Sequence, residues 1–344
     1  MQKIAVKTLV ISPNWIGDAV MTLPLIKSLH DKGHVIDVLA PSVVAPIYEN
    51  CSNVAKVIQH KYPHKKLLLV SRIKLALELK KNNYDCIYIL PNSLKSAIIP
   101  IVINTKNIIG YKGEFPRKFF LSHAFTSQGK KMPMVEHYHN LAMADISLEG
   151  CNLVSNLSEE TKIKLEPKID LSEDINNSCL DKFNLNNKKY IAIAIGAEYG
   201  PAKQWPLEHF SKLIEFIHEK YDDLHIILLG SPKDKPQAQS LVNHDRTINL
   251  CGSTSLTEAM HIIKKAKKVL THDSGLMHIA AAIGTDLLAI YGSTSPHHTP
   301  PLAKNAKYMW LQLECSPCFK RTCPLNHYAC LNDIKPQQVF ENLL

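Results

Sequence analysis

The alternation of short apolar, β-branched runs with segments of helical periodicity constrains the fold of this chain more than any other feature. The runs are KTLVIS, VIDVLA, VAKVIQ and YDCIYIL in the first half, then YIAIAIGA, LHIILLG, TINLCG, KKVLTHDS and DLLAIYG. Strands that alternate with helices form βαβ units with parallel sheets. The runs are apolar on both faces, which is typical of strands that helices cover on both sides. The sequence therefore predicts an α/β fold.

The length of the chain predicts two domains. With 344 residues, of which 45% are hydrophobic, the chain is longer than one domain usually is. The apolar runs are interrupted by a polar, Asn-rich stretch, and we place the boundary at residues 165 to 188. We expect two Rossmann-like domains, residues 1–170 and 171–344, that meet across a cleft. In such sheets ligands bind at the carboxyl ends of the strands.

Several familiar nucleotide-binding motifs are absent from the sequence. No G-x-G-x-x-G follows the first strand, and no G-x-x-x-x-G-K-[ST] occurs anywhere. These absences count against a dinucleotide oxidoreductase and a P-loop enzyme. No D-x-D occurs either, which counts against a sugar-nucleotide site built on a carboxylate-held divalent metal.

The segment THDSGLMHIAAAIG, residues 271–284, is the best candidate for a phosphate site. It follows the apolar end of a strand and opens a helix for which Asp273 or Ser274 would be the N-cap. The backbone N–H groups of Ser274, Gly275 and the next residue would then suit a diphosphate. His278, about one turn further on, points back toward the same end. The alternative is an ordinary capped helix, because Ser and Asp favour that position anyway.

Two further loops follow predicted strands. GAEYGPAKQWP, residues 196–206, cannot continue its strand and carries Lys203, whose ammonium group can neutralise a leaving diphosphate without a metal. The alternative is that Lys203 is only solvated. GSPKD, residues 230–234, could touch a nucleoside.

Asp18 follows the first strand in ISPNWIGDAVMTLPLIKSLH. Because Pro24 cannot lie deep in a straight helix, either the helix kinks or its main body begins near Thr22 with Pro24 in the first turn. In the second case Asp18 lies in the approach loop beside Gly17, where a carboxylate is a natural general base. The alternative is that Asp18 only caps a short first turn.

The formal charge of +9 is spread unevenly. Basic residues gather in two groups, Lys56, Lys61, Lys65, Lys66, Arg72, Lys74, Lys80 and Lys81, and Lys112, Arg117, Lys118, Lys130 and Lys131. They form either a solvated face or a surface for an anionic partner, and no nucleic-acid signature accompanies them. No run is long and apolar enough for a membrane span, and residues 1–8 lack the centre of a signal peptide, so we expect a cytoplasmic protein.

Four of the nine cysteines lie in ECSPCFKRTCPLNHYAC, at Cys315, Cys318, Cys323 and Cys330. The opening C-x-x-C suits zinc or an iron-sulfur cluster, but the later spacings match no standard pattern. Metal binding and a reduced, stabilising role both remain open. The other cysteines are scattered, as small buried hydrophobic residues are.

Four separated motifs resemble those of the lipopolysaccharide heptosyltransferases of glycosyltransferase family 9, and in particular the heptosyltransferase II group. The motifs are NWIGDAVMT, YILPNSLKSAIIP, GAEYGPAKQWP and THDSGLMHIAAAIGTDLLAIYGSTSPHHTPPL, in this order over nearly the whole chain. The resemblance implies a GT-B fold with an N-terminal acceptor-binding domain and a C-terminal donor-binding domain. It also implies metal-independent, inverting transfer in lipopolysaccharide core biosynthesis. The donor would be ADP-L-glycero-β-D-manno-heptose and the acceptor the first heptose on Kdo-lipid A.

The resemblance also implies roles for individual residues. Asp18 matches the base and Lys203 the phosphate-contacting Lys, and these two are the catalytic residues we expect. The donor would contact Gly17, Glu198, Lys203, Ser231, Asp273, Ser274, Gly275 and His278. The acceptor would contact Asn92, Ser93 and Lys95. No resident metal or other cofactor is expected.

The anionic glycolipid acceptor would place the protein at the inner leaflet of the inner membrane. Phe115, Phe119 and Phe120, beside Arg117 and Lys118, could rest at that surface, although such aromatic residues more often lie in a core. Two other functions remain possible from the sequence: a sugar-nucleotide epimerase of similar fold, and a protein that binds a nucleotide sugar or glycolipid without catalysis.

Overall fold

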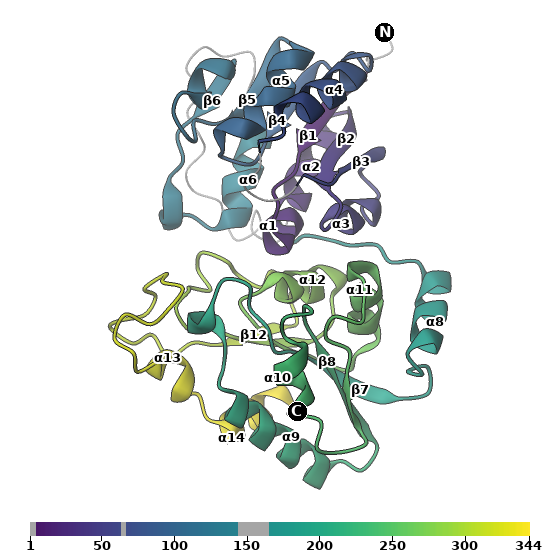
Figure 1. Ribbon diagram of the computed structural model, residues 1–344, viewed down its shortest axis with the longest axis vertical. Coiled ribbons are helices and arrows are strands. Elements are labelled where there is room, and N and C mark those ends of the chain that lie inside the picture. The colour runs from purple at the N-terminus through teal and green to yellow at the C-terminus, as the bar shows by residue number, and fades with distance from the viewer. Residues whose placement is uncertain (1–4, 63–66, 144–164) are drawn as a thin grey trace. The chain divides into compact units, whose positions relative to one another are not determined.

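A computed structural model describes residues 5–62, 67–143 and 165–344, and these divide into two units. The units are Met1–Pro167 and Lys168–Leu344. Figure 1 shows that each unit consists of strands surrounded by helices. Among the described residues, no helix combines the length and hydrophobicity needed to cross a membrane.

The N-terminal unit is built on a six-stranded parallel sheet of order β3-β2-β1-β4-β5-β6. Apolar side chains of β1 and β4 pack against helices α4 and α5 in one core, which includes Leu9, Ile87, Ile89, Leu79 and Ile99. The strands are β1 Val6–Ile11, β2 His34–Pro41, β3 Lys56–His60, β4 Cys86–Ile89, β5 Asn107–Tyr111 and β6 His123–Phe125. The helices are α1 Ile16–Met21, α2 Leu23–Asp31, α3 Ala45–Glu49, α4 Leu69–Lys80, α5 Ile98–Ile103 and α6 Met134–Ala142, with short 3-10 helices η1 Leu94–Ala97, η2 Arg117–Phe120 and η3 Gly129–Lys131.

The C-terminal unit repeats the same topology in the strand order β12-β11-β10-β7-β8-β9. Its core joins β7, β8 and α9 through residues such as Ile191, Ile226, Phe210 and Leu213. The strands are β7 Lys189–Ala194, β8 Leu224–Leu229, β9 Thr247–Asn249, β10 Val269–His272, β11 Leu287–Ile290 and β12 Ala306–Met309. The helices are α8 Glu173–Lys182, α9 Leu207–Lys220, α10 Lys235–Gln239, α11 Leu256–Lys265, α12 Gly275–Ile283, α13 Ala329–Asn332 and α14 Pro336–Leu343, with the 3-10 helix η4 Pro201–Lys203.

Both sheets therefore have the doubly wound strand order, in which the direction of winding reverses between the first and the fourth strand of the unit. The reversal lies between β1 and β4 in the N-terminal unit and between β7 and β10 in the C-terminal unit. The predicted α/β fold with two parallel sheets is confirmed. The loops that follow these four strands are the expected places for ligands.

Candidate functional site

The N-terminal unit has a cavity of about 1060 Å³ beside the carboxyl ends of β1 and β4. The structure brings together in its lining Asp18, Asn92, Ser93 and Lys95, four residues that the sequence placed in two separate motifs. The other polar residues in the lining are Asn14, Glu114 and Tyr138. Because β1 and β4 are neighbouring parallel strands, their following loops share one edge of the sheet.

Asp18 lies in a short helix and not, as predicted, in an approach loop. Helix α1 spans Ile16–Met21 and has Asp18 in its first turn, directly after Gly17, while Trp15 occupies the N-cap position. The main helix α2 begins after its N-cap Thr22, with Pro24 in the first turn, as predicted. The approach segment is helical because nothing before Pro24 prevents one turn from forming. Asp18 is thus the N-cap of neither α1 nor α2, and it lines the cavity.

Tyr138 is a residue of this cavity that sequence reasoning missed and that contacts Asp18. It lies on α6, is only 5% exposed, and its hydroxyl group forms a hydrogen bond with the Asp18 carboxylate. Burial, followed by the charge of Asp18, raises the pKa of Tyr138 well above its ordinary value. The phenol therefore stays protonated and donates this hydrogen bond. No sequence signal identifies Tyr138, because it lies in an ordinary amphipathic helix far along the chain from Asp18.

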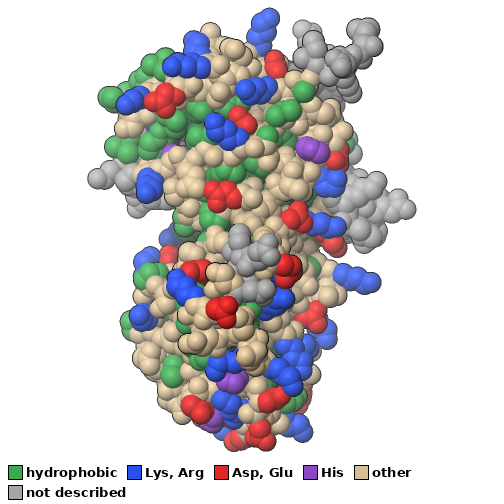
Figure 2. All heavy atoms as spheres, turned by 90° about the vertical axis from the view of Figure 1, so that its right-hand side faces the viewer, with side chains coloured by type: hydrophobic (Ala, Val, Ile, Leu, Met, Phe, Trp, Pro, Cys, Tyr) green, Lys and Arg blue, Asp and Glu red, His purple; other side chains and the backbone are tan. Residues whose placement is uncertain are grey.

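Large apolar side chains are exposed around this cavity. Leu67, Leu94, Ile101 and Phe120 line the cavity and are also between 36% and 51% exposed. Helix α4 adds an exposed apolar stripe, and the segment before β6 adds two exposed rings; these residues are Leu69, Val70, Ile73, Leu77, Phe115 and Phe119. We call this set the apolar rim. Figure 2 shows hydrophobic side chains at the surface of the N-terminal unit, with Lys and Arg side chains among them.

Two of the basic residues near the rim are buried, although both were predicted to lie at the surface. Arg72 is 8% exposed, and its Nε donates to the Leu67 carbonyl oxygen at 2.8 Å. Arg117, predicted to lie at the surface, is fully buried, and its guanidinium group donates hydrogen bonds to the carbonyl groups of Tyr111 and Ile89. Burial lowers the pKa of Arg117 to about 10. Lys118 is exposed, with its Nζ 4.9 Å from the centre of the Phe119 ring. The predicted Lys65 and Lys66 lie outside the described residues.

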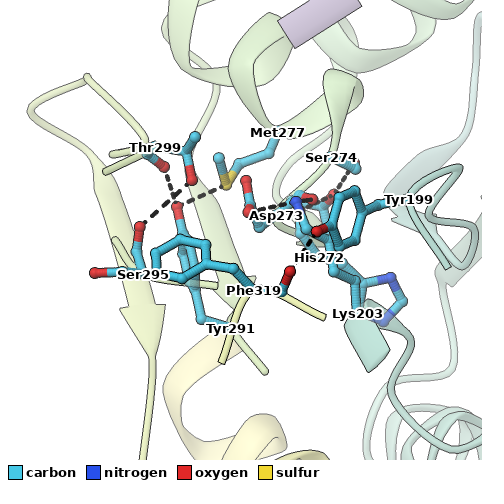
Figure 3. A network of polar contacts seen from close by, with 11 residues as sticks. Tyr199, Lys203, His272, Asp273, Ser274, Met277, Tyr291, Ser295, Thr299 and Phe319 are labelled. Carbon is cyan, nitrogen blue, oxygen red and sulfur yellow. Dashed lines mark hydrogen bonds and ion pairs between the residues drawn. The ribbon is translucent and has the colours of Figure 1, made fainter. Parts of the chain in front are cut away.

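The C-terminal unit holds a buried ion pair at the carboxyl ends of β7 and β10. Lys203 ends η4 after β7, and Asp273 follows β10. The Lys203 Nζ donates to Asp273 Oδ2 at 2.6 Å and to the Asp273 carbonyl oxygen at 3.1 Å (Figure 3). The side chains are 12% and 3% exposed, so Lys203 is not the solvated residue of the alternative interpretation.

Helix α12 begins beside this pair. Ser274 is its N-cap residue, as predicted, and Gly275 its first helical residue. The Ser274 hydroxyl group lies 3.1 Å from that of Thr271 and makes no capping hydrogen bond, so the helix start keeps its partial positive charge. His278 is buried one turn further on, and burial lowers its pKa to about 4. His278 is therefore neutral at physiological pH and leaves Lys203 as the full positive charge here.

The remaining predicted donor residues lie at the carboxyl ends of β7 and β8. Glu198 is exposed and pairs with Lys233 at 3.2 Å. The Ser231 backbone N–H and hydroxyl groups both donate to Asp234 Oδ2 at 2.7 Å. Asp234, which sequence reasoning missed, fills the space over Gly196, where a Cβ atom would lie 2.3 Å from its carboxylate. A side chain at position 196 would therefore displace the Asp234 carboxylate from its hydrogen bonds with Ser231.

The four clustered cysteines are not joined by disulfide bonds and remain thiols. Within residues 5–62, 67–143 and 165–344, no group of three or more His, Cys, Asp or Glu side chains is arranged to hold a metal ion.

Comparison with known proteins gives consistent matches over the whole chain. The sequence profile of glycosyltransferase family 9 (heptosyltransferase) matches residues 72–329. Lipooligosaccharide heptosyltransferase 2 of Haemophilus ducreyi is 35% identical over 358 residues, covering 98% of each chain. Lipopolysaccharide heptosyltransferase 2 of Escherichia coli is 33% identical over 348 residues, covering 98% of this chain and 97% of that protein.

A solved structure agrees with these matches. The structure of E. coli ADP-heptose lps heptosyltransferase II superposes with a TM-score of 0.80 at 31% identity, covering 98% of this chain and 97% of that one. Neither the epimerase nor the non-catalytic binding protein is favoured by these relatives.

Proposed function

The chain belongs to glycosyltransferase family 9, and we propose that it transfers L-glycero-D-manno-heptose from ADP-heptose to the first heptose of the lipopolysaccharide inner core. The observation that carries the proposal is the near full-length similarity to heptosyltransferase 2 enzymes, at 33% to 35% identity. The site residues support it, because a carboxylate lies in one cavity and a cation with a helix start lies in the other unit.

Each unit has the chemistry of one substrate. The N-terminal domain, residues 1–170, would bind the acceptor sugar through Asn92, Ser93 and Lys95 around Asp18. The C-terminal domain, residues 171–344, would bind the donor. Its positive charge at Lys203 and at the start of α12 suits a diphosphate. The loops after β7 and β8, with Glu198 and Ser231, would then receive the nucleoside.

The reaction follows from these groups. The bond between the anomeric carbon and the diphosphate oxygen breaks, and the electron pair leaves with ADP. Lys203 and the α12 N–H groups stabilise the charge that develops on the diphosphate. The acceptor hydroxyl attacks the opposite face of the oxocarbenium-like carbon while Asp18 takes its proton, so the configuration inverts, as in inverting glycoside hydrolysis. Because the protein itself supplies the positive charge at the diphosphate, we propose that the transfer uses no metal ion.

We also propose that the enzyme acts on the cytoplasmic side of the inner membrane, with the apolar rim against the inner leaflet. Val70 is 81% exposed, Phe115 79% and Phe119 69%, and such apolar exposure on one unit is unusual for a surface that meets only water. Exposed Lys74, Lys80 and Lys118 flank these residues and would attract anionic lipids. The rim borders the cavity, which suits an acceptor with a sugar head and a lipid anchor.

Flotation with vesicles tests the membrane contact. Val70→Glu together with Phe119→Glu should lower binding to phosphatidylglycerol vesicles by at least about tenfold, because two apolar contacts are lost and two negative charges are gained. Leu325→Glu is the matched control, since Leu325 is 58% exposed but lies in the C-terminal unit. Equal binding of both proteins would refute the proposed surface.

Release of ADP from ADP-heptose, with and without an acceptor that ends in its first heptose, tests the function itself. Release that requires the acceptor is the expected result. Release without acceptor would indicate hydrolysis or another donor-only reaction, and no release would contradict the proposed donor. Asp18→Asn should lower kcat by at least about 10²-fold with ADP binding retained. Asp31→Asn, the same chemical change at an exposed carboxylate outside the cavity lining, serves as the control and should have little effect.

A further inference from the structure

The turn between Cys318 and Cys323 packs directly on the loop that carries Lys203. The Tyr199 hydroxyl group donates to the Phe319 carbonyl oxygen at 2.6 Å, as Figure 3 shows. The Ala202 backbone N–H donates to the Arg321 carbonyl oxygen at 3.0 Å. Two hydrogen bonds thus connect the cysteine-rich segment with the loop after β7, although the two lie about 120 residues apart in the chain.

The approach of the two segments is close enough to require glycine. Gly200 has a φ of +144°, and a Cβ atom there would lie 2.6 Å from the Arg321 carbonyl oxygen. Any side chain at Gly200 would push the turn away from the loop. Gly200 therefore lies at the contact between the backbone of this loop and that of the cysteine-rich turn. This close contact explains why the loop contains Gly200 in addition to Gly196.

Two cations lie close to the Tyr199 ring. The Lys203 Nζ is 4.9 Å from the ring centre, and the Arg321 guanidinium carbon is 5.3 Å from it. The ring attracts both cations. Lys203 is thus held by the Asp273 carboxylate at 2.6 Å and by the Tyr199 ring. The ring itself is held by the hydrogen bond to the cysteine-rich turn.

Hydrogen bonds also connect the cysteine-rich turn with the loop that follows β11. The Phe319 backbone N–H donates to the Ser293 carbonyl oxygen at 2.7 Å, and the Ser316 hydroxyl group donates to the Gly292 carbonyl oxygen at 2.6 Å. Gly292 and Ser293 follow β11, and the Ser293 N–H donates to the Ala202 carbonyl oxygen at 3.1 Å. The loops after β7 and β11 and the turn therefore form one connected unit at this edge of the sheet.

We propose that the cysteine-rich turn is a positioning element for the donor diphosphate. Arg321 and Phe319 hold Tyr199, and Tyr199 holds the Lys203 ammonium group where the phosphate oxygens arrive. Tyr199 and Arg321 are positioning residues, because they act through Lys203. This inference rests on the proposed function, in which Lys203 contacts the diphosphate of the donor.

Calorimetric titration with ADP and with adenosine tests the inference without requiring turnover. Adenosine lacks the phosphates and reports on the nucleoside contacts alone. Tyr199→Leu should weaken ADP binding by about tenfold, the usual scale of a partly buried cation–π contact, and leave adenosine binding unchanged. Tyr199→Phe retains the ring but loses the hydrogen bond to the Phe319 carbonyl oxygen, so its ADP affinity should lie between those of Tyr199→Leu and the wild type. Arg321→Gln should weaken ADP binding by about threefold or more.

Lys320→Gln is the matched control, because Lys320 is an exposed cation on the same turn. It should bind ADP within about twofold of the wild type, since its loss changes only the general charge near the site. Arg321 is also exposed, so Arg321→Gln keeps the test valid if Tyr199→Leu fails to fold.

The outcomes distinguish a wrong donor assignment from a wrong positioning role. If the wild-type protein binds no ADP, the proposed donor is wrong, and the inference falls with it. If the wild type binds ADP and all variants bind it equally well, only the positioning role is overturned. A parallel loss of ADP and adenosine binding would also overturn it, because that result indicates a general distortion of the loop.

Discussion

Replacement of Tyr138 by Phe should impair the proposed base while leaving the cavity in place. The substitution removes only the hydroxyl group that hydrogen-bonds Asp18 and keeps the buried ring on α6. A hydrogen bond from a neutral donor stabilises the charged form of a carboxylate. Without it, the Asp18 carboxylate should take up a proton at a higher pH and should be less firmly oriented toward the acceptor.

The size of the effect follows from the charge of the acceptor, because Asp18 accepts this hydrogen bond as a carboxylate. A hydrogen bond to a charged group contributes about 1.5 to 3 kcal/mol, and about 1.4 kcal/mol corresponds to one pH unit in a titration. The acid limb of the kcat/KM profile should therefore move up by about one to two pH units. At alkaline pH, where Asp18 is ionised in both proteins, kcat should fall by only about tenfold or less. This loss is smaller than the loss of about 10²-fold or more expected for Asp18→Asn.

The assay is initial-rate ADP release over a range of pH at saturating donor. Tyr111→Phe is the matched control, because Tyr111 is also a buried tyrosine of this unit and its hydroxyl group donates to the His137 carbonyl oxygen at 2.5 Å. Both variants lose one buried tyrosine hydrogen bond and should lose similar thermal stability. Only Tyr138→Phe should move the acid limb. An unmoved limb in Tyr138→Phe, or the same movement in both variants, would refute the proposed contact with the base.

Three other predictions concern the C-terminal unit. Lys203→Met should weaken ADP binding by at least about tenfold at low salt and leave adenosine binding unchanged, as calorimetry would show; equal losses for both ligands would contradict a phosphate role. Burial alone would raise the pKa of the Cys323 thiol, but hydrogen bonds from the backbone N–H groups of residues 325–328 outweigh this effect, so that pKa is lowered. Burial raises the pKa of Cys330 to about 11. N-ethylmaleimide should therefore label Cys323 well before Cys330 near neutral pH, which peptide mass spectrometry would detect, and the reverse order would be inconsistent with this environment. Burial lowers the pKa of His272 and of His278 to about 4 from the ordinary 6.5, so the unfolded chain takes up these protons first as the pH falls. The contribution of the two neutral histidines to stability is complete above pH 6.5. As the pH falls from about 7 to about 5, the free energy of unfolding, measured in urea, should decrease by about 2 kcal/mol for each histidine. A His278→Gln variant should show a smaller decrease, and a decrease equal to that of the wild type would contradict this prediction.

The sequence predicts the central strands of both sheets because their apolar runs are long and buried on both faces. β1, β4, β7 and β10 lie within predicted runs, except that β1 and β7 each begin one residue earlier, and they position the loops that carry Asp18, Asn92, Lys203 and Asp273. Three strands, β5, β6 and β12, were not predicted. The inner strand β5 is short but largely buried and was overlooked, whereas β6 and β12 lie at sheet edges. β6 has three residues, and in β12 two of the four residues are exposed, so neither has the apolar pattern of a covered strand.

The supporting contacts of the site could not be predicted for a different reason. Tyr138, Tyr199 and Asp234 act through partners that only the tertiary fold brings close. Tyr138 lies in an ordinary amphipathic helix, whereas Tyr199 and Asp234 lie in predicted loops for which the sequence pointed to other residues, Lys203 and Ser231. The burial of Arg117 also depends on tertiary contacts that the sequence does not indicate. Its charge suggests a surface position, but carbonyl oxygens of β4 and β5 accept its hydrogen bonds inside the unit.

The two units have the same strand order but opposite chemistry at the point where the winding reverses. In the N-terminal unit the loops after the first and fourth strands present a carboxylate held by a neutral phenol. In the C-terminal unit the equivalent loops present an ammonium group and a helix start, next to two histidines that burial keeps uncharged. Each site also contains one group of the other charge, because Asp273 pairs with Lys203 at 2.6 Å and Lys95 lines the cavity of Asp18. Inverting transfer needs a proton acceptor and an anion stabiliser at the same time, and a duplicated topology allows each to be tuned in its own surroundings.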